Sequence, residues 1–394
     1  MKFIHTSDWH IGRQFHNVSL IDDQRHVLDQ LIQHIKNEAV DALIIAGDIY
    51  DRSIPPASAV ALLDEVLNKI CVELETPVIL ISGNHDSAER LGFAANQLSQ
   101  SGLHILSNIK NIAKPISLKD KQGNIVDFYG IPYNDPEQVR HYFDVDVKDY
   151  NEAQNVLIDE IKKVKNQQHH NVLLSHCFID GAEDSESERP LSIGGADRVS
   201  YQPLIEFDYV ALGHLHSPQY KGEQHIRYSG SLLKYSFSEQ HQKKSFTLVE
   251  FNQKDKAETQ DLFSDANNNI ALSYLPIKPL RDVRIIEGEL ESILDNGKTD
   301  IQSNDYVLVR LTDTHAILDA MGKLRSVYPN ILHLEKPGIM KIGDQKSINR
   351  EQLKRSELDM FRDFFTQVSG EKLSDNQDQA IENIMQTLHS KSKN

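Results

Sequence analysis

Five short apolar runs in this sequence each end directly in a polar cluster that contains Asp, Asn or His. The runs are FIHT, ALIIA, VILIS, VLLS and YVAL, and runs of this length are typical of buried strands. The clusters that follow them contain, in order, Asp8 and His10, Asp48, Asn84 to Asp86, His176, and His214 with His216. In an open α/β sheet, ligands bind at the carboxyl ends of the strands. We therefore expect these polar side chains to gather at one edge of a sheet.

Two amphipathic segments stand between the first three runs. Near residues 22–38, Val27, Leu31 and Ile35 recur at helical spacing, and a second segment near 57–75 repeats the pattern. Alternating strands and helices predict an α/β domain in which helices cover a sheet. The later strand-like runs have fewer helices between them, which favours mixed sheets. The predicted fold is a sandwich of mixed β-sheets flanked by helices.

The chain is predicted to contain three domains. The sandwich occupies residues 1–270, and the polar stretch 252–275 is interpreted as a linker. A small α+β domain follows at 276–340, with strands near 283–286, 306–311 and 331–334 and a helix around 315–327. Residues 350–394 are predicted to form two amphipathic helices, the second beginning at a capping-box pair, Ser374 and Gln377. Their apolar stripes consist of Leu358, Phe361, Phe365 and Val368, and of Ile381, Ile384, Met385 and Leu388.

Composition narrows the classes of protein that the chain can belong to. It has 394 residues and a formal net charge of −16, which argues against a protein that binds nucleic acid strongly by itself. The two cysteines, Cys71 and Cys177, are too few for a disulfide scaffold or a zinc knuckle. No apolar run approaches the length of a membrane span, and the first residues do not resemble a secretion signal. We expect a cytoplasmic protein without a membrane partner.

The polar clusters have the composition of a metal centre. Carboxylate, amide and imidazole donors without a thiolate suit divalent Mn, Fe or Zn. Seven donors are too many for one ion but fit two ions about 3.5–4 Å apart that share a carboxylate. Asp48 is the predicted bridge, because Gly47 before it permits close approach of the backbone. Each cluster alone is also typical of a turn or a helix cap, whereas five at successive strand ends favour a metal centre.

The ordered clusters resemble those of the calcineurin-like metallophosphoesterase superfamily, and within it those of the SbcD family of bacterial nuclease subunits. The segments that carry the resemblance are HTSDWHIG, AGDIYDRSIPP, GNHD, ESERPLSIGG, ALGHLH, RYSGSLLKYSFSE and KPLRDVRIIEGEL. These motifs are specific from residue 1 to about residue 290, and the similarity continues more loosely through the small domain and the tail.

The resemblance implies two metal ions, typically Mn²⁺. One would be bound by Asp8, His10, Asp48 and His216, and the other by Asp48, Asn84, His176 and His214. His85 matches the family's catalytic histidine, and Asp86 beside it is expected to orient its ring. A histidine held in this way could stabilise the phosphate or protonate the departing oxygen as a general acid. Archaeal and eukaryotic relatives have a second histidine where this chain has Asp51, so a second acid–base group in that loop is in doubt.

The resemblance also implies an activity and partners. The expected activity is ATP-dependent 3′-to-5′ exonuclease action on duplex DNA, with endonuclease action on single strands and hairpins, in DNA repair, recombination and replication. The small α+β domain would be a capping domain that binds DNA. The expected partner is an SbcC-type ATPase, whose coiled coil the tail helices would bind, with two copies of this chain as a homodimer within a heterotetramer. No GxxxxGK[ST] loop is present, so the ATP site is expected on the partner.

Four residues are weaker candidates for substrate contacts. Arg227 and Ser229 could donate hydrogen bonds to a phosphate, although RYSGS is equally typical of a hairpin turn. Lys243 and Lys244 could contact DNA, although a solvated turn is the simpler interpretation.

Two alternative functions remain open. AGDIYDRS and GNHD are close to the GDxxDRG and GNHE motifs of serine/threonine protein phosphatases, but the paired histidines and the region after residue 275 argue against that class. A non-catalytic scaffold on the same fold would have lost ligands, and here all seven are present.

Overall fold

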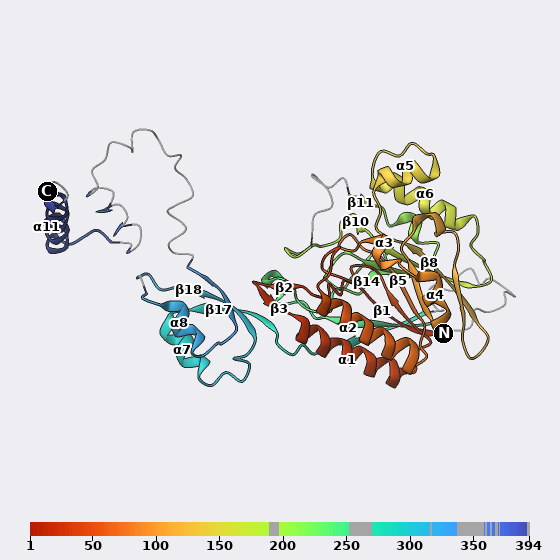
Figure 1. The fold of residues 1–394 in the computed structure, drawn as a ribbon, viewed down its shortest axis with the longest axis horizontal. Coiled ribbons are helices and arrows are strands. Elements are labelled where there is room, and N and C mark those ends of the chain that lie inside the picture. The colour runs from red at the N-terminus through yellow and green to blue at the C-terminus, as the bar shows by residue number, and fades with distance from the viewer. Residues whose placement is uncertain are drawn as a thin grey trace. The chain divides into compact units, whose positions relative to one another are not determined.

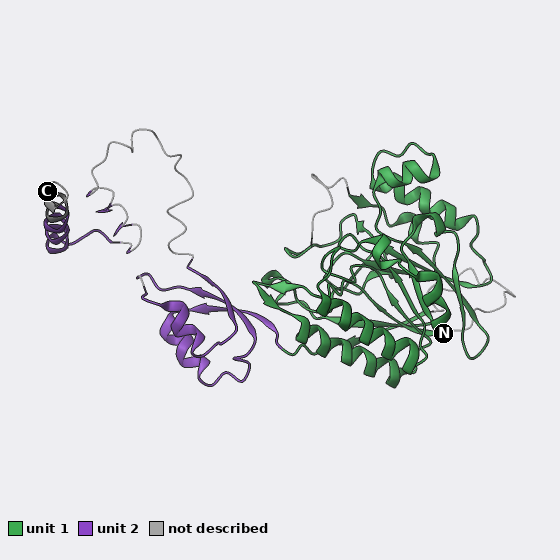
Figure 2. Cartoon of the chain, viewed as in Figure 1, with its two compact units in different colours: residues 1–280 green, residues 281–394 purple. Residues whose placement is uncertain are grey.

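The computed structural model describes residues 1–188, 197–251, 270–315, 317–336 and 371–391, together with Leu358, Phe361, Arg362, Phe365, Thr366 and Ser369. The chain divides into two compact units, residues 1–280 and 281–394 (Figure 2). Most of the predicted linker, residues 252–269, lies outside the described residues, as does Val368 of the first tail stripe.

The first sheet of unit 1 has the strand order β16-β15-β1-β4-β5-β6. Its strands are β1 (Lys2–Thr6), β4 (Ala42–Ile45), β5 (Val78–Ile81), β6 (Leu103–Leu106), β15 (Ser245–Phe251) and β16 (Ile270–Pro276). Strands β1, β4, β5 and β6 are parallel, whereas β15 and β16 are antiparallel to their neighbours. All residues of β4 and β5 are buried, as expected for parallel strands that are covered on both faces.

Strand β16 corrects one sequence-based prediction, because residues 270–275 were assigned to the linker. They form an edge strand that pairs with β15 along its whole length. Ile270 and Leu272 pack against the core between the sheets, whereas the alternating residues Ala271 and Ser273 are exposed. This period of two is short and interrupted by polar residues, so it resembles a linker in the sequence.

The second sheet has the order β13-β14-β12-β9-β8-β7 and is also mixed. Its strands are β7 (Ile116–Lys119), β8 (Ile125–Ile131), β9 (His170–His176), β12 (Tyr209–Gly213), β13 (Gln219–Lys221) and β14 (Glu223–Tyr228). The four central strands are parallel, and the two edge strands are antiparallel to them. The predicted sandwich of mixed sheets is confirmed.

Aromatic side chains join the two sheets. Phe3 of β1 contacts Phe128 of β8 and Tyr209 of β12, with ring centroids 5.5 and 5.8 Å apart in edge-to-face geometry. The same buried cluster takes Ile44 and Val172 from the two sheets. The core of unit 1 therefore lies between the sheets.

Helices cover the outer faces of the sandwich (Figure 1). Helices α1 (Ile21–Glu38) and α2 (Ala57–Leu67) lie on the first sheet, where His34 of α1 contacts Phe246 of β15. A π-helical segment, η1 (Asn68–Glu73), continues α2. Helices α5 (Pro136–Phe143) and α6 (Tyr150–Lys162) lie on the second sheet, where Leu157 of α6 shares a buried cluster with Leu173. Shorter elements are β2 (Gln14–Phe15), β3 (Val18–Ser19), α3 (Ala88–Leu91), α4 (Ala95–Leu98), β10 (Phe178–Ile179) and β11 (Arg198–Val199).

Unit 2 contains a parallel three-stranded sheet, β17 (Val283–Gly288), β18 (Tyr306–Leu311) and β19 (Ile331–Glu335). Helices α7 (Leu290–Gly297) and α8 (Ala320–Arg325) pack on it, with Ile293 and Leu324 in one cluster with Val307. Helix α7 was not predicted, and α8 is shorter than the predicted helix. Helix α11 (Asp375–Lys391) begins after Ser374, whose backbone N–H donates to Gln377 Oε1 at 3.0 Å. Among the described residues, no helix is long and apolar enough to span a membrane.

Candidate metal centre

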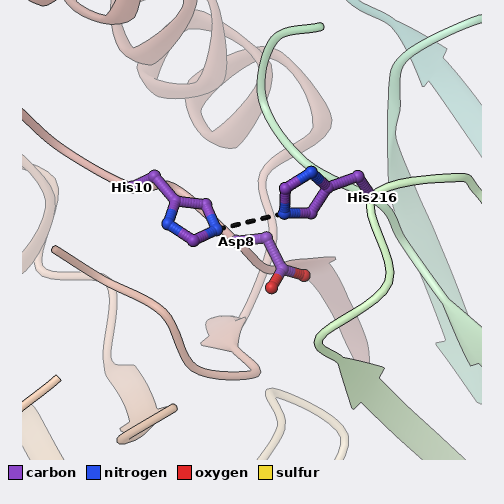
Figure 3. A group of neighbouring side chains, drawn as sticks. All are labelled: Asp8, His10 and His216. Atoms are coloured by element: carbon purple, nitrogen blue, oxygen red, sulfur yellow. Dashed lines mark hydrogen bonds between the residues drawn. The ribbon is translucent and has the colours of Figure 1, made fainter. Parts of the chain in front are cut away.

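The five predicted strand ends meet at one edge of the sandwich. The ends of β1, β4 and β5 in the first sheet lie beside those of β9 and β12 in the second, as contacts from Asp8 to His214 and from Ala46 and Asn84 to His176 show. Two groups of buried side chains result, each with ligand atoms within 4.8 Å of one another, namely Asp8, His10 and His216, and Asp8, Asp48 and His176. Figure 3 shows the first group, in which both imidazole rings and the carboxylate converge.

The backbone at these strand ends is strained. Asp8, His10, Asp48 and His214 all have positive φ angles, of 53°, 45°, 51° and 108°. Such conformations cost on the order of 1–3 kcal/mol each and concentrate at functional sites. Here they are held by backbone hydrogen bonds between the loops, from Asp8 N to Gly47 O at 3.0 Å and from His10 N to Asp48 O at 2.9 Å.

Glycines before the candidate ligands let the loops pack this closely. A Cβ at Gly213 would lie 1.8 Å from the carbonyl oxygen of Ala46, and a Cβ at Gly83 would lie 2.1 Å from Asp48 Oδ1. Gly47 has a φ of +94°, which other residues rarely adopt. The sequence predicted close approach of the backbone at Gly47, and the structure has glycines that permit it at three strand ends, those of β4, β5 and β12.

The first donor group centres on His10 and His216. Their Nε2 atoms lie 3.1 Å apart (Figure 3). His10 Nε2 also lies 3.6 Å from Asp48 Oδ2. The Asp8 carboxylate accepts the backbone N–H of His214 at 3.0 Å. Among the described residues, the buried Nδ1 atom of His10 has no hydrogen-bond partner, although Asp51 Oδ1 is 3.7 Å away.

The donors around His176 form a second donor group, which consists of His176, His214, Asn84 and Asp48 and shows why a cation fits. His176 Nδ1 donates to the carbonyl oxygen of Ala46 at 2.9 Å, so a neutral ring has a bare lone pair on Nε2. That nitrogen faces Asn84 Oδ1 at 2.9 Å and Asp48 Oδ2 at 3.6 Å. His214 Nδ1 lies 3.2 Å from the same Asn84 oxygen. Buried acceptors that face one another repel unless a cation lies between them, so the donor set fits a divalent metal.

Electrostatics point the same way. Burial and the neighbouring Asp48 charge raise the pKa of Asp8 well above its usual range. Burial, with the neighbouring His216, lowers the pKa of His10, and burial lowers the pKa values of His176 and His214. Neutral imidazole is the form in which a histidine binds a metal ion. The raised pKa of Asp8 reflects burial and repulsion from the Asp48 carboxylate, and a bound cation would offset both and favour the ionised form of Asp8.

The structure places His85 beside these groups but corrects the role of Asp86. The backbone N–H of His85 donates to Asp48 Oδ1 at 2.9 Å, and its ring lies 4.6 Å from the ring of His10. His85 Nδ1 bonds to the backbone carbonyl of Asp51 at 2.8 Å, so Asp51 orients the ring.

The carboxylate of Asp86 instead ties two loops together. It accepts backbone N–H groups from Gly83 at 2.9 Å, Ile49 at 3.1 Å and Tyr50 at 2.9 Å. Burial, with the Asp48 charge, raises the pKa of Asp86 to about 7. The prediction for Asp86 was wrong because side chains that are adjacent in the sequence can point in different directions. The actual partner of His85 is a backbone carbonyl, and such a partner cannot be recognised from the sequence.

Three of the four weak substrate candidates are also corrected. Arg227 is 6% exposed, and its guanidinium donates to the hydroxyl of Tyr274 at 2.6 Å. Ser229 is 1% exposed, and its hydroxyl lies 3.1 Å from that of Ser7. Lys244 is 7% exposed and forms a 2.6 Å ion pair with Glu239. Lys243 is exposed, and its DNA contact stays a prediction.

Two arginines that were not among the predicted site residues lie beside the centre. Arg13 and Arg52 line an open cavity of ≈ 440 Å³ together with His85 and Asn84. Both flank Asp51, with Arg13 Nη1 at 3.1 Å from Oδ1 and Arg52 Nε at 3.6 Å from Oδ2. Arg13 and Arg52 follow shortly after the first two polar clusters in the sequence, and this proximity could have indicated that they lie near the site.

Comparison with known proteins agrees with this geometry. Residues 1–218 match the family model of the calcineurin-like phosphoesterases, and residues 279–369 match the type 5 capsule protein repressor C-terminal domain. The fold and the donor set thus define the class as a metal-dependent phosphoesterase.

Two curated relatives narrow the assignment, and both are SbcD subunits of the nuclease SbcCD. The relative from Staphylococcus epidermidis is 34% identical over 388 residues, 98% of both chains. The relative from Staphylococcus saprophyticus is 34% identical over 392 residues, again 98% of both chains. A solved dimetal phosphatase from Danio rerio aligns with a TM-score of 0.38 at 12% identity, covering 63% of this chain and 92% of that one, a likeness too low to support any argument. The chain belongs to the SbcD family of calcineurin-like phosphoesterases.

Proposed function

We propose that this chain is the metal-dependent nuclease subunit of an SbcCD-type complex and hydrolyses phosphodiester bonds in DNA. The observation that carries the proposal is the position of Asp48. Its Oδ2 atom lies 3.6 Å from His10 Nε2 and 3.6 Å from His176 Nε2, between the two donor groups. A carboxylate so placed can serve two ions, the arrangement used for in-line displacement at phosphorus. Membership of a family of nuclease subunits supports DNA as the substrate.

The proposed metals are two divalent ions, with Mn²⁺ suited to the oxygen and nitrogen donors. One would be held by Asp8, His10, Asp48 and His216, and the other by Asp48, Asn84, His176 and His214. Bound ions of this kind lower the pKa of water and neutralise charge that develops on the phosphoryl group.

His85 is the proposed general acid. Its Nδ1 bonds to the Asp51 carbonyl, which leaves Nε2 as the nitrogen that would hold a proton against the departing oxygen. Arg13 and Arg52 line the cavity beside His85 and would attract the DNA backbone there. Because the chain as a whole carries a net charge of −16, we expect a partner to supply much of the affinity for DNA.

We further propose that the chain works with an SbcC-type ATPase as a homodimer within a heterotetramer in the cytoplasm. ATP-dependent 3′-to-5′ digestion of duplex ends and cleavage of single strands and hairpins would be the activities of that complex. Helix α11 supports the partnership, because Ile384 on its predicted apolar stripe is 56% exposed and free to contact a coiled coil.

Cleavage of an end-labelled DNA hairpin in Mn²⁺ tests the proposal. The native chain should cut the hairpin, and His85→Gln should cut about 10²–10⁴-fold more slowly, the usual contribution of a general acid. His141→Gln, at an exposed histidine on α5, is the matched control and should cut at the native rate. Should the native chain be silent both alone and with the ATPase and ATP while it hydrolyses a phosphomonoester, the chain is a phosphatase.

A further inference from the structure

The side of the His216 ring that carries Nδ1 contacts a hydrogen-bonded relay of two side chains, the half-buried Ser187 and the fully buried Glu239. His216 Nδ1 lies 2.6 Å from the hydroxyl oxygen of Ser187, which in turn lies 2.5 Å from Glu239 Oε1. Glu239 itself lies 3.6 Å from His216 Nδ1, too far for a direct hydrogen bond. The hydroxyl of Ser187 therefore connects the carboxylate to the ring.

The direction of the hydrogen bonds in this relay follows from the groups involved. Glu239 is fully buried and paired with the ammonium of Lys244 at 2.6 Å, so its carboxylate is ionised and can only accept. Ser187 must then give its single proton to Glu239, which leaves only lone pairs to face His216. The ring must donate from Nδ1, and a neutral ring then has a bare Nε2.

The bare Nε2 is the atom that faces the candidate metal centre, 3.1 Å from His10 Nε2. The backbone of His216 is held as well, because its N–H donates to Glu188 Oε1 at 2.7 Å and its carbonyl accepts from Lys244 Nζ at 2.7 Å. Ring and backbone are thus fixed by the same short segment, 187–188, and the same buried ion pair.

We propose that Ser187 and Glu239 are positioning residues for His216, which hold its ring in the tautomer that presents Nε2 to a divalent metal. This inference rests on the proposed function, in which His216 binds one of two ions. It also gives Lys244 a role other than the predicted contact with DNA, because its positive charge keeps Glu239 ionised on the side of His216 that faces away from the candidate metal centre. Partners of this kind typically contribute 10–100-fold to the metal affinity of a histidine site.

Calorimetric titration of the metal-free chain with Mn²⁺ tests the inference. The wild type should bind two ions, and Ser187→Ala should weaken one of the two by about 10–100-fold. Ser187→Thr keeps the hydroxyl and should bind both ions as the wild type does. Glu239→Gln should weaken the same ion, whereas Glu223→Gln, at the exposed start of β14, should change neither.

The tautomer itself gives a second readout that a merely structural role would not move. In ¹⁵N spectra of histidine-labelled, metal-free protein, the His216 signals should show a proton on Nδ1 in the wild type and a mixture of tautomers in Ser187→Ala. A wild type that binds no Mn²⁺ would overturn the proposed metal centre. A wild type that binds two ions, with unchanged affinities and tautomer in Ser187→Ala, would overturn the relay and leave the proposed function standing.

Discussion

At the residue scale, the candidate metal centre depends on glycines, because the backbones of the strand ends lie too close together for a Cβ atom to fit between them. The carbonyl of Ala46 occupies the space where a Cβ of Gly213 would lie, and the same carbonyl accepts the Nδ1–H of His176. One close contact thus sets both the strand separation and the tautomer of a candidate ligand.

Gly213→Ala should therefore disrupt the site. The added methyl group would lie 1.8 Å from the Ala46 oxygen, so the ends of β4 and β12 must separate. We expect the free energy of unfolding to fall by about 1–3 kcal/mol, as for other overpacked sites, and Mn²⁺ binding to weaken with it. Urea unfolding and calorimetry measure the two effects, and unchanged values of both would contradict the packing described here.

A buried histidine outside the site predicts a pH dependence of stability. Burial, together with the nearby charge of Arg227, lowers the pKa of His5 to about 3. The unfolded chain binds a proton at His5 below about pH 6.5, whereas the folded chain does so only near pH 3. The contribution of His5 is therefore fully present above pH 6.5 and is lost as the pH falls toward 3.

Between pH 7.5 and pH 5.0, the wild type should lose about 2 kcal/mol of unfolding free energy more than His5→Gln. Urea titrations in the presence of a chelator measure this difference without a metal contribution. Other buried histidines affect both proteins equally and cancel in the comparison. Identical losses in the two proteins would mean that His5 is protonated in the folded state.

At the element scale, the two sheets are joined by more than their core. Arg227 of β14 in the second sheet donates to the hydroxyl of Tyr274 of β16 in the first, at 2.6 Å. The guanidinium also lies 4.7 Å above the Tyr274 ring. This contact connects the two sheets through the edge strand β16, most of whose residues were predicted to be a linker.

Tyr274→Phe should lower the free energy of unfolding by about 1.5–3 kcal/mol, because it removes a hydrogen-bond acceptor from a buried charged group. Tyr220→Phe, at an exposed tyrosine on β13, is the control and should be close to neutral. Urea unfolding of the three proteins is the measurement. Equal stability of the two variants would show that Arg227 finds another acceptor.

At the scale of the whole molecule, every candidate metal ligand lies in unit 1. A chain that ends at Leu280 retains both sheets, including β16, and all seven ligands. We expect it to hydrolyse bis-(p-nitrophenyl) phosphate in Mn²⁺ at the rate of the full chain, and to fail to associate with the ATPase partner. A folded truncated chain without activity on this small diester would mean that unit 2 contributes to the chemistry.

The sandwich, the strand ends and the side chains that gather there were all predictable from the sequence, because apolar periodicity and the polar residue after each strand are local features. Helix α7 and strand β16 were missed because their apolar positions are few and mixed with polar ones. Three contacts became visible only in the folded chain: Asp51 orients His85, Lys244 is buried against Glu239, and Ser187 links His216 to that same carboxylate. The contacts at His85 and in the relay join residues 34, 29 and 52 positions apart, through a backbone carbonyl and a single hydroxyl that no local pattern encodes.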